Sequence, residues 1–266
     1  MRQRGRFPLS HSITRLGDVS MEQSDVNKLK RWFAGYAARF YSIDEDVRKH
    51  ASLKEEHTYK VMEHSREMAS WLGLGPSETA LAEVIALFHD VGRFRQYETY
   101  RTFVDHKSVD HARLGLEVIQ GLPELDCLSR REREIFNFAI ATHNTMRLPE
   151  TADDDHRLFA RIIRDADKLD IYRVLSGQLQ PPSAQGFSPS IVRDLLAGTQ
   201  SSYTEMRTLD DRKLMRLSWV YDINYDWTLE RVVRSGYLEE IIRLLPQSED
   251  IEKVVRRLRE YILKRL

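Results

Sequence analysis

The 266-residue sequence contains little cysteine, glycine or proline: one, 12 and 8 residues respectively. Its single cysteine, Cys127, has no partner for an internal disulfide, so the chain is not a disulfide-stapled secreted domain. We therefore expect it in the cytoplasm. Few turn-forming residues, together with 31% charged residues, favour helices with solvated outer faces over a turn-rich β protein. The predicted fold class is all-α.

The sequence also lacks long apolar runs and a net charge. No stretch approaches the roughly 18 apolar residues of a membrane-spanning helix, and no signal-peptide core follows the arginines near the start. Basic residues number 41 and acidic residues also 41, so charge gives no reason to expect a membrane or a nucleic acid polymer as a partner. The sequence leaves open whether the chain forms a homo-oligomer.

Three segments differ in character. Residues 1–20 are polar, and we predict an N-terminal extension without chemistry of its own. Residues 21–180 have helical periodicity and carry every candidate site residue. The pattern breaks around Pro181 and Pro182, and residues 181–266 are helical again. We expect this last segment to be a C-terminal helical extension packed on the same domain.

Apolar residues recur at three- to four-residue spacing through most of the chain, which is helical periodicity. Pro76 is expected to open one helix and Gly73 to end another. Gly92 is expected to end the helix that reaches His89, before a loop rich in Tyr, Arg and Thr. The predicted helices are 23–41, 53–72, 76–88, 108–120, 129–143, 156–175, 189–197, 209–221, 227–245 and 248–266.

His89 and Asp90 close an almost wholly apolar helix. The pair alone is a weak signal, because a histidine can cap a helix C-terminus and an aspartate can bond loop amides. An ionised Asp in apolar surroundings is nevertheless costly without a cation or hydrogen-bond partners. His57 upstream and Asp167 downstream, both on apolar helix faces, complete the order H…HD…D. A metal site is therefore one interpretation of the set.

The words HTYKV, LFHDVGRF, DHARLG and RDADKLD together resemble the HD-domain superfamily of metal-dependent phosphohydrolases, over about residues 50–175. This resemblance implies an HD-domain helical bundle with additional C-terminal helices, and one divalent metal held by four residues. Asp165, Asp167 and Asp170 compete for the last ligand position. The family word A-D-[KR]-L matches residues 166–169 and selects Asp167. The implied ligands are His57, His89, Asp90 and Asp167.

His111 and His143 lie near predicted helix ends between Asp90 and Asp167. Isolated histidines of this kind are most often structural. Superfamily members with two extra histidines in this interval tend to hold a second metal, however, so the resemblance implies that His111 and His143 are ligands too. An imidazole and carboxylate set suits iron, manganese, cobalt, nickel or zinc better than calcium. We expect one ion, and a second remains open.

The resemblance implies a phosphohydrolase in which metal-activated water attacks a small phosphate ester, such as a nucleotide or a related phosphomonoester or phosphodiester. Asp90 and Arg93 are the candidate catalytic residues, because Arg93 follows Asp90 closely and a guanidinium can bind two phosphate oxygens. Two alternatives are a di-iron oxygenase with a similar ligand set, and a non-catalytic protein that senses a metal or nucleotide. Nothing resembles a GYP motif or a synthetase domain, so cyclic dinucleotide or alarmone specificity is not indicated.

Overall fold

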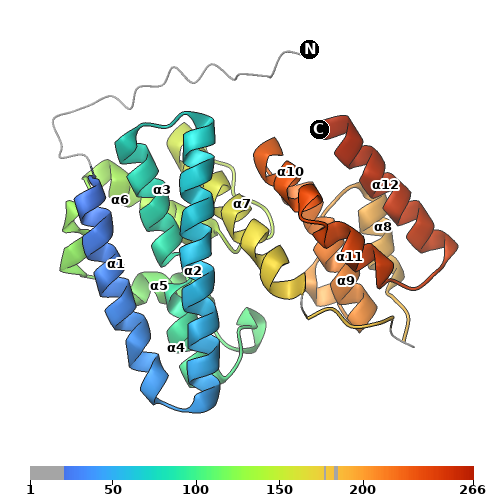
Figure 1. Ribbon diagram of the computed structural model, residues 1–266, viewed down its shortest axis with the longest axis horizontal. Coiled ribbons are helices and arrows are strands. Elements are labelled where there is room, and N and C mark those ends of the chain that lie inside the picture. The colour runs from blue at the N-terminus through green and yellow to red at the C-terminus, as the bar shows by residue number, and fades with distance from the viewer. Residues whose placement is uncertain (1–20, 177, 183–184) are drawn as a thin grey trace.

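The computed structural model describes residues 21–176, 178–182 and 185–266, so the predicted extension at residues 1–20 lies outside it. Within these residues every regular element is helical and no strand occurs, which confirms the all-α class (Figure 1). The N-terminal helices are α1 (Gln23–Ala38), α2 (Glu45–Leu72), α3 (Pro76–Phe88), α4 (Val91–Tyr100), α5 (His111–Val118), α6 (Arg130–Thr142) and α7 (Asp154–Ser176). The C-terminal helices are α8 (Pro189–Ala197), α9 (Leu209–Ser218), α10 (Asp226–Arg234), α11 (Tyr237–Arg243) and α12 (Glu249–Arg265). Single 3₁₀ turns join them: η1 (Arg39–Ser42), η2 (Asp105–Lys107), η3 (Pro123–Cys127), η4 (Tyr203–Glu205) and η5 (Trp219–Asp222).

Helix α3 forms the centre of the N-terminal helices. Every residue from Ala80 to Phe88 is buried, as expected for a helix that is apolar on all sides. It packs against α1, α2, α6 and α7. Because α3 runs through the core, its C-terminal end delivers His89 and Asp90 to the middle of the bundle, where both are buried.

Several predicted helix ends match the structure. Gly73 ends α2 with a left-handed φ of 74°, and Pro76 is the first residue of α3. Ser129 and Glu132 form the capping box of α6, and His143 is the C-cap of that helix. These local signals work because each satisfies backbone groups that a helix end leaves unpaired.

The prediction that Gly92 ends a helix before a loop is wrong. The break falls at Asp90, and the chain continues as helix α4. Gly92 serves helix packing instead, since a Cβ there would lie 2.2 Å from the His111 carbonyl oxygen and 2.6 Å from the Gly115 nitrogen. Its missing side chain lets α4 and α5 cross closely. This crossing brings His111 beside Asp90.

Other helix limits also differ from prediction. Helix α2 begins at Glu45 rather than near residue 53, because the Asp44 side chain accepts a bond from the Val47 amide and caps it. The predicted helix 227–245 is two helices, α10 and α11. Gly236 separates them with a φ of 78°, a conformation that glycine adopts without the steric cost of a side chain.

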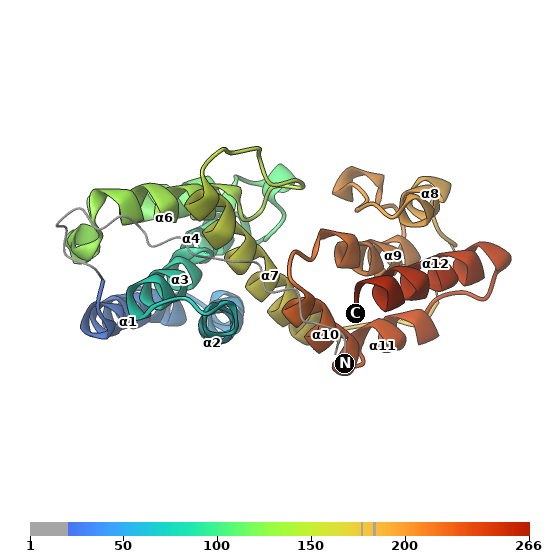
Figure 2. The same cartoon turned by 90° about the horizontal axis from the view of Figure 1, so that it is seen from above.

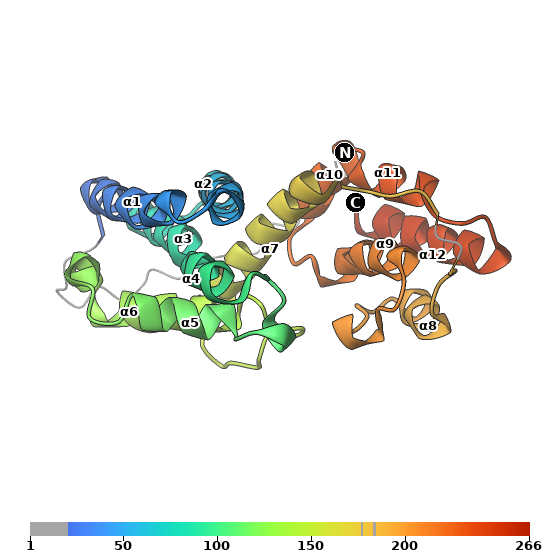
Figure 3. The same ribbon diagram turned by 90° about the horizontal axis from the view of Figure 1, so that it is seen from below.

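The C-terminal helices pack against α7, which runs between the two groups of helices (Figures 2 and 3). Helices α10 and α11 contact α7 directly. The buried Asp165 carboxylate accepts hydrogen bonds from the backbone nitrogens of Asn224 (2.9 Å) and Tyr225 (2.8 Å). The division at residues 180 and 181 stays a prediction. Among the described helices, none is long and apolar enough to cross a membrane.

Candidate metal centre

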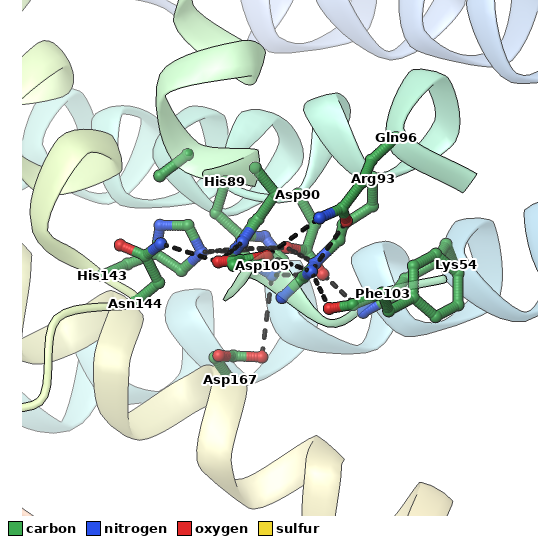
Figure 4. Close-up of polar contacts among 12 residues, drawn as sticks. Lys54, His89, Asp90, Arg93, Gln96, Phe103, Asp105, His143, Asn144 and Asp167 are labelled. Atoms are coloured by element: carbon green, nitrogen blue, oxygen red, sulfur yellow. Dashed lines mark hydrogen bonds and ion pairs between the residues drawn. The ribbon is translucent and has the colours of Figure 1, made fainter. Parts of the chain in front are cut away.

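Six side chains from five helical regions lie close together in the N-terminal bundle. Figure 4 labels four of them, His89, Asp90, His143 and Asp167. His57 lies in the middle of α2, His89 and Asp90 lie between α3 and α4, and His111 begins α5. His143 ends α6, and Asp167 lies in the middle of α7. The four histidines and Asp90 are buried, and the Asp167 side chain is 17% exposed. The structure therefore brings together all six predicted ligands, although their role as ligands stays a prediction.

The first cluster lies at one oxygen of the Asp90 carboxylate. Asp90 Oδ2 is 3.6 Å from His57 Nε2 and 3.6 Å from His89 Nε2. Asp167 Oδ1 approaches the same two nitrogens, at 3.1 Å from His57 and 3.7 Å from His89. His57, His89 and Asp90 thus form one group of potential ligands, and Asp167 approaches its two histidines.

The second cluster lies at the other oxygen of Asp90. Asp90 Oδ1 is 3.3 Å from His111 Nε2 and 3.7 Å from His143 Nε2. The two Nε2 atoms are 3.0 Å apart. Asp90 therefore belongs to two groups of potential ligands, one with His57 and His89 and the other with His111 and His143.

The Nδ1 atom of each histidine has a partner that only accepts hydrogen bonds. His89 Nδ1 donates to the Ala86 carbonyl at 2.7 Å, and His143 Nδ1 donates to the Ile140 carbonyl at 2.7 Å. His57 Nδ1 lies 2.6 Å from Asp170 Oδ2, and His111 Nδ1 lies 2.7 Å from Asp105 Oδ2. These partners set the tautomer, so each neutral ring turns the lone pair of Nε2 toward Asp90.

This arrangement fits divalent cations. The buried Nε2 atoms of His57 and His89 have no hydrogen-bond partner. In their neutral forms, His111 and His143 point two lone pairs at each other across 3.0 Å, and lone pairs repel unless a proton or a cation lies between them. A cation at each cluster would satisfy all four nitrogens and offset the negative charge of two acids.

Comparison with known protein families agrees with this geometry. Residues 55–172 match the family model of the HD domain. This stretch is an HD domain. It contains all six predicted ligands and ends before the first of the C-terminal helices. Searches of curated proteins and of solved structures found no match.

Electrostatics keep the two acids of the HD domain ionised. Burial alone would raise the pKa of Asp90, but the charges of Lys54 and His89 outweigh it and hold the pKa well below its usual value. Burial also acts on Asp167, yet the close approach of His57 and His89 outweighs it and lowers the pKa of Asp167 well below the usual value. Ionised carboxylates are the form that binds cations.

Two charged residues of the site were missed by the sequence analysis. Lys54 Nζ lies 2.6 Å from Asp90 Oδ2, and Asp105 pairs with both His111 and Arg93. A signal for Lys54 was present, since residues three apart on a helix share a face and Lys54 precedes His57 by one turn. Asp105 lies in the short turn η2 between two helices, where no helical periodicity predicts which way a side chain points.

Arg93 has partners within the HD domain. Its Nη1 atom donates to Gln96 Oε1 and to Asp105 Oδ1, each at 2.8 Å, and to the Phe103 carbonyl. Its Nε atom is 3.5 Å from Asp90 Oδ1. Arg93 thus anchors the loop that carries Asp105, and through Asp105 it steadies His111. Phosphate binding by Arg93 stays a prediction.

The three acids of α7 point in different directions. Asp167 lies beside His57 and His89. Asp170 lies within hydrogen-bond distance of Nδ1 of His57. Asp165 accepts hydrogen bonds from the C-terminal segment. Of the other histidines, His64 belongs to neither cluster of potential ligands, and burial lowers its pKa.

Asp170 and Asp105, which pair with Nδ1 of His57 and of His111, lead to two matched predictions. We expect Asp170→Asn to weaken ion binding mainly at the His57 cluster, and Asp105→Asn to weaken it mainly at the His111 cluster, each by about 10- to 100-fold. An amide cannot replace the carboxylate that fixes and polarises the imidazole. Metal titration against a competing chelator measures both affinities. Equal effects of both variants on a single affinity would contradict two separate clusters.

Proposed function

We propose that this chain is a metal-dependent phosphohydrolase that acts on a small phosphate ester, a nucleotide or a related phosphomonoester or phosphodiester. The observation that carries the proposal is the position of Asp90. Its two carboxylate oxygens face two different histidine pairs. A carboxylate shared in this way suits a pair of ions about 3.5 to 4 Å apart, an arrangement typical of phosphoester hydrolysis.

In this proposal His57, His89 and Asp167 would hold one ion, His111 and His143 would hold the other, and Asp90 would contribute to both. When bound, the ions supply an activated water nucleophile near neutral pH and a positive charge that polarises the phosphoryl group. The histidine and carboxylate donors suit iron, manganese, cobalt, nickel or zinc. Asp105 and Asp170 orient the imidazoles behind them.

Lys54 supplies a positive charge for the substrate. Its ammonium contacts the same Asp90 oxygen that the His57 cluster would offer to an ion, so the ion and Lys54 compete for that oxygen. Lys54 also lies 5.3 Å from the centre of the Phe103 ring, and its side chain is only 17% exposed. A phosphate at the ions would give this partly desolvated ammonium a new negative partner.

We therefore expect Lys54→Met to lower kcat/KM at least about tenfold, mainly by raising KM, without weakening metal binding. Removal of a competing cation leaves Asp90 free for the ion. Steady-state kinetics at saturating metal, with chelator competition alongside, test this. Lys60→Met is the matched control, because Lys60 is on the same helix, half exposed and paired with Glu63. Weaker metal binding with unchanged KM would contradict the role given to Lys54.

A screen of the purified protein tests the function itself. The protein is stripped with a chelator, reloaded separately with Mn²⁺, Fe²⁺, Co²⁺, Ni²⁺ or Zn²⁺, and assayed for phosphate release from nucleoside monophosphates, phosphodiesters and sugar phosphates. We expect metal-dependent release from at least one class. Dioxygen consumption with an organic substrate, and no release, would favour the oxygenase. Binding without any turnover would favour a sensor.

A further inference from the structure

Tyr203 begins the 3₁₀ turn η4, and half of its surface (50%) is exposed. In Figures 2 and 3, η4 lies on the side of the C-terminal helices that faces the HD domain, across from η2. The turn η2 contains Asp105, which pairs with His111 and Arg93. The turn η4, which begins at Tyr203, is thus on the part of the C-terminal segment that faces the HD domain.

The electrostatic surroundings of Tyr203 link it to that centre. The pKa of Tyr203 is raised to about 12. Burial is the main cause and the Asp167 charge adds to it, whereas Trp219 and the Arg93 charge act in the opposite direction. The hydroxyl is therefore within electrostatic reach of a candidate ligand and of the candidate phosphate-binding residue. Half of the Tyr203 residue is exposed, so a ligand can reach it.

Direct contacts join the C-terminal segment to α7, the helix that carries Asp167. Asp222, at the end of η5, lies 2.6 Å from Lys168 and 2.7 Å from Arg164. Lys168 follows Asp167 in α7, so the C-terminal segment is tied to α7 one residue away from a candidate ligand. Trp219, also on η5, is buried edge to face against Tyr172 of α7, with ring centres 5.6 Å apart.

We propose that the C-terminal helices complete the substrate site, with the Tyr203 ring as a stacking platform for the base of a nucleoside 5′-phosphate. The inference rests on the proposed function, because the ions, Lys54 and Arg93 would take the phosphate. Each base has a flat π face, so an accessible aromatic ring binds bases through stacking. An accessible ring on the turn that faces the HD domain would provide a second contact that a nucleotide can use and a sugar phosphate cannot.

Two substrates that differ only in the base test the platform: adenosine 5′-monophosphate and ribose 5-phosphate. We expect Tyr203→Ala to lower kcat/KM for adenosine 5′-monophosphate at least about tenfold, through KM, and to change it less than about twofold for ribose 5-phosphate. Tyr203→Phe keeps the ring and should retain most of the wild-type value. Tyr100→Ala is the control, since Tyr100 is 45% exposed at the far end of α4, about 15 Å along the helix from Asp90.

Equal losses for both substrates, or no loss for either, would overturn the platform. Calorimetry measures the binding of the same two compounds to the metal-loaded protein and tests the stacking platform independently of turnover. A preference for adenosine 5′-monophosphate that Tyr203→Ala abolishes supports the platform, even if no phosphate is released and the proposed hydrolysis fails. Equal wild-type affinity for the two compounds contradicts the platform, even if both are hydrolysed.

Discussion

Asp90→Asn should abolish both metal binding and phosphohydrolase activity. We expect metal content to fall from two ions per chain to less than one, and kcat/KM to fall at least about a thousandfold, roughly 4 kcal/mol of transition-state stabilisation. The reason is that Asp90 offers one oxygen to each histidine pair. The amide nitrogen of asparagine cannot bind a cation, and the loss of charge weakens both clusters at once.

Metal analysis after chelator competition, together with kinetics at saturating metal, measures these effects. Asp126→Asn is the control, because the Asp126 side chain is 81% exposed in η3 and belongs to no cluster of potential ligands. Retention of two ions by Asp90→Asn would show that Asp90 does not join the clusters. Loss of activity with full metal content would assign Asp90 a role other than ligand.

Asp165→Ala should strongly destabilise the fold without removing the ions. The carboxylate is buried and accepts bonds from the backbone and side-chain nitrogens of Asn224 and from the backbone of Tyr225. Alanine would leave these partly buried donors without an acceptor. We expect the free energy of unfolding to fall by about 3 kcal/mol, which lowers Tm by about 6 to 12 °C for a chain of this size.

Thermal unfolding of the metal-free protein measures the loss, and metal analysis of the folded variant checks the site. Asp154→Ala is a suitable control, because Asp154 begins the same helix with a side chain that is 70% exposed. Its loss should cost no more than about 1 kcal/mol. An unchanged Tm for Asp165→Ala would mean that this carboxylate does not hold the C-terminal segment to α7.

Helix geometry explains why one of three nearby acids faces the metal centre. Successive residues on an α-helix are 100° apart, so Asp165 and Asp167 point to nearly opposite sides of α7, whereas Asp170 lies near the Asp167 face. The family word selected Asp167, and its position beside the histidines agrees. The partner of Asp165 could not be predicted, because it lies 59 residues away and only the tertiary packing brings it there.

The fold class and the convergence of the candidate ligands were predictable, since apolar periodicity marks helices and the order of His and Asp residues resembles the HD domain. The role of Gly92 was not. A glycine after a helix most often signals an end, whereas here it permits α4 to cross α5. Lys54, Asp105 and Tyr203 were missed for a related reason: their roles depend on neighbours from other elements, which local patterns do not reveal.

Anomalous X-ray scattering from crystals of the Mn²⁺-loaded protein shows directly whether Asp90 joins two metal sites. We predict two peaks, one on each side of the Asp90 carboxylate. One should lie about 2 Å from His57 Nε2 and His89 Nε2, and the other about 2 Å from His111 Nε2 and His143 Nε2. A single peak, or His111 and His143 more than about 6 Å from any peak, would contradict a centre shared through Asp90.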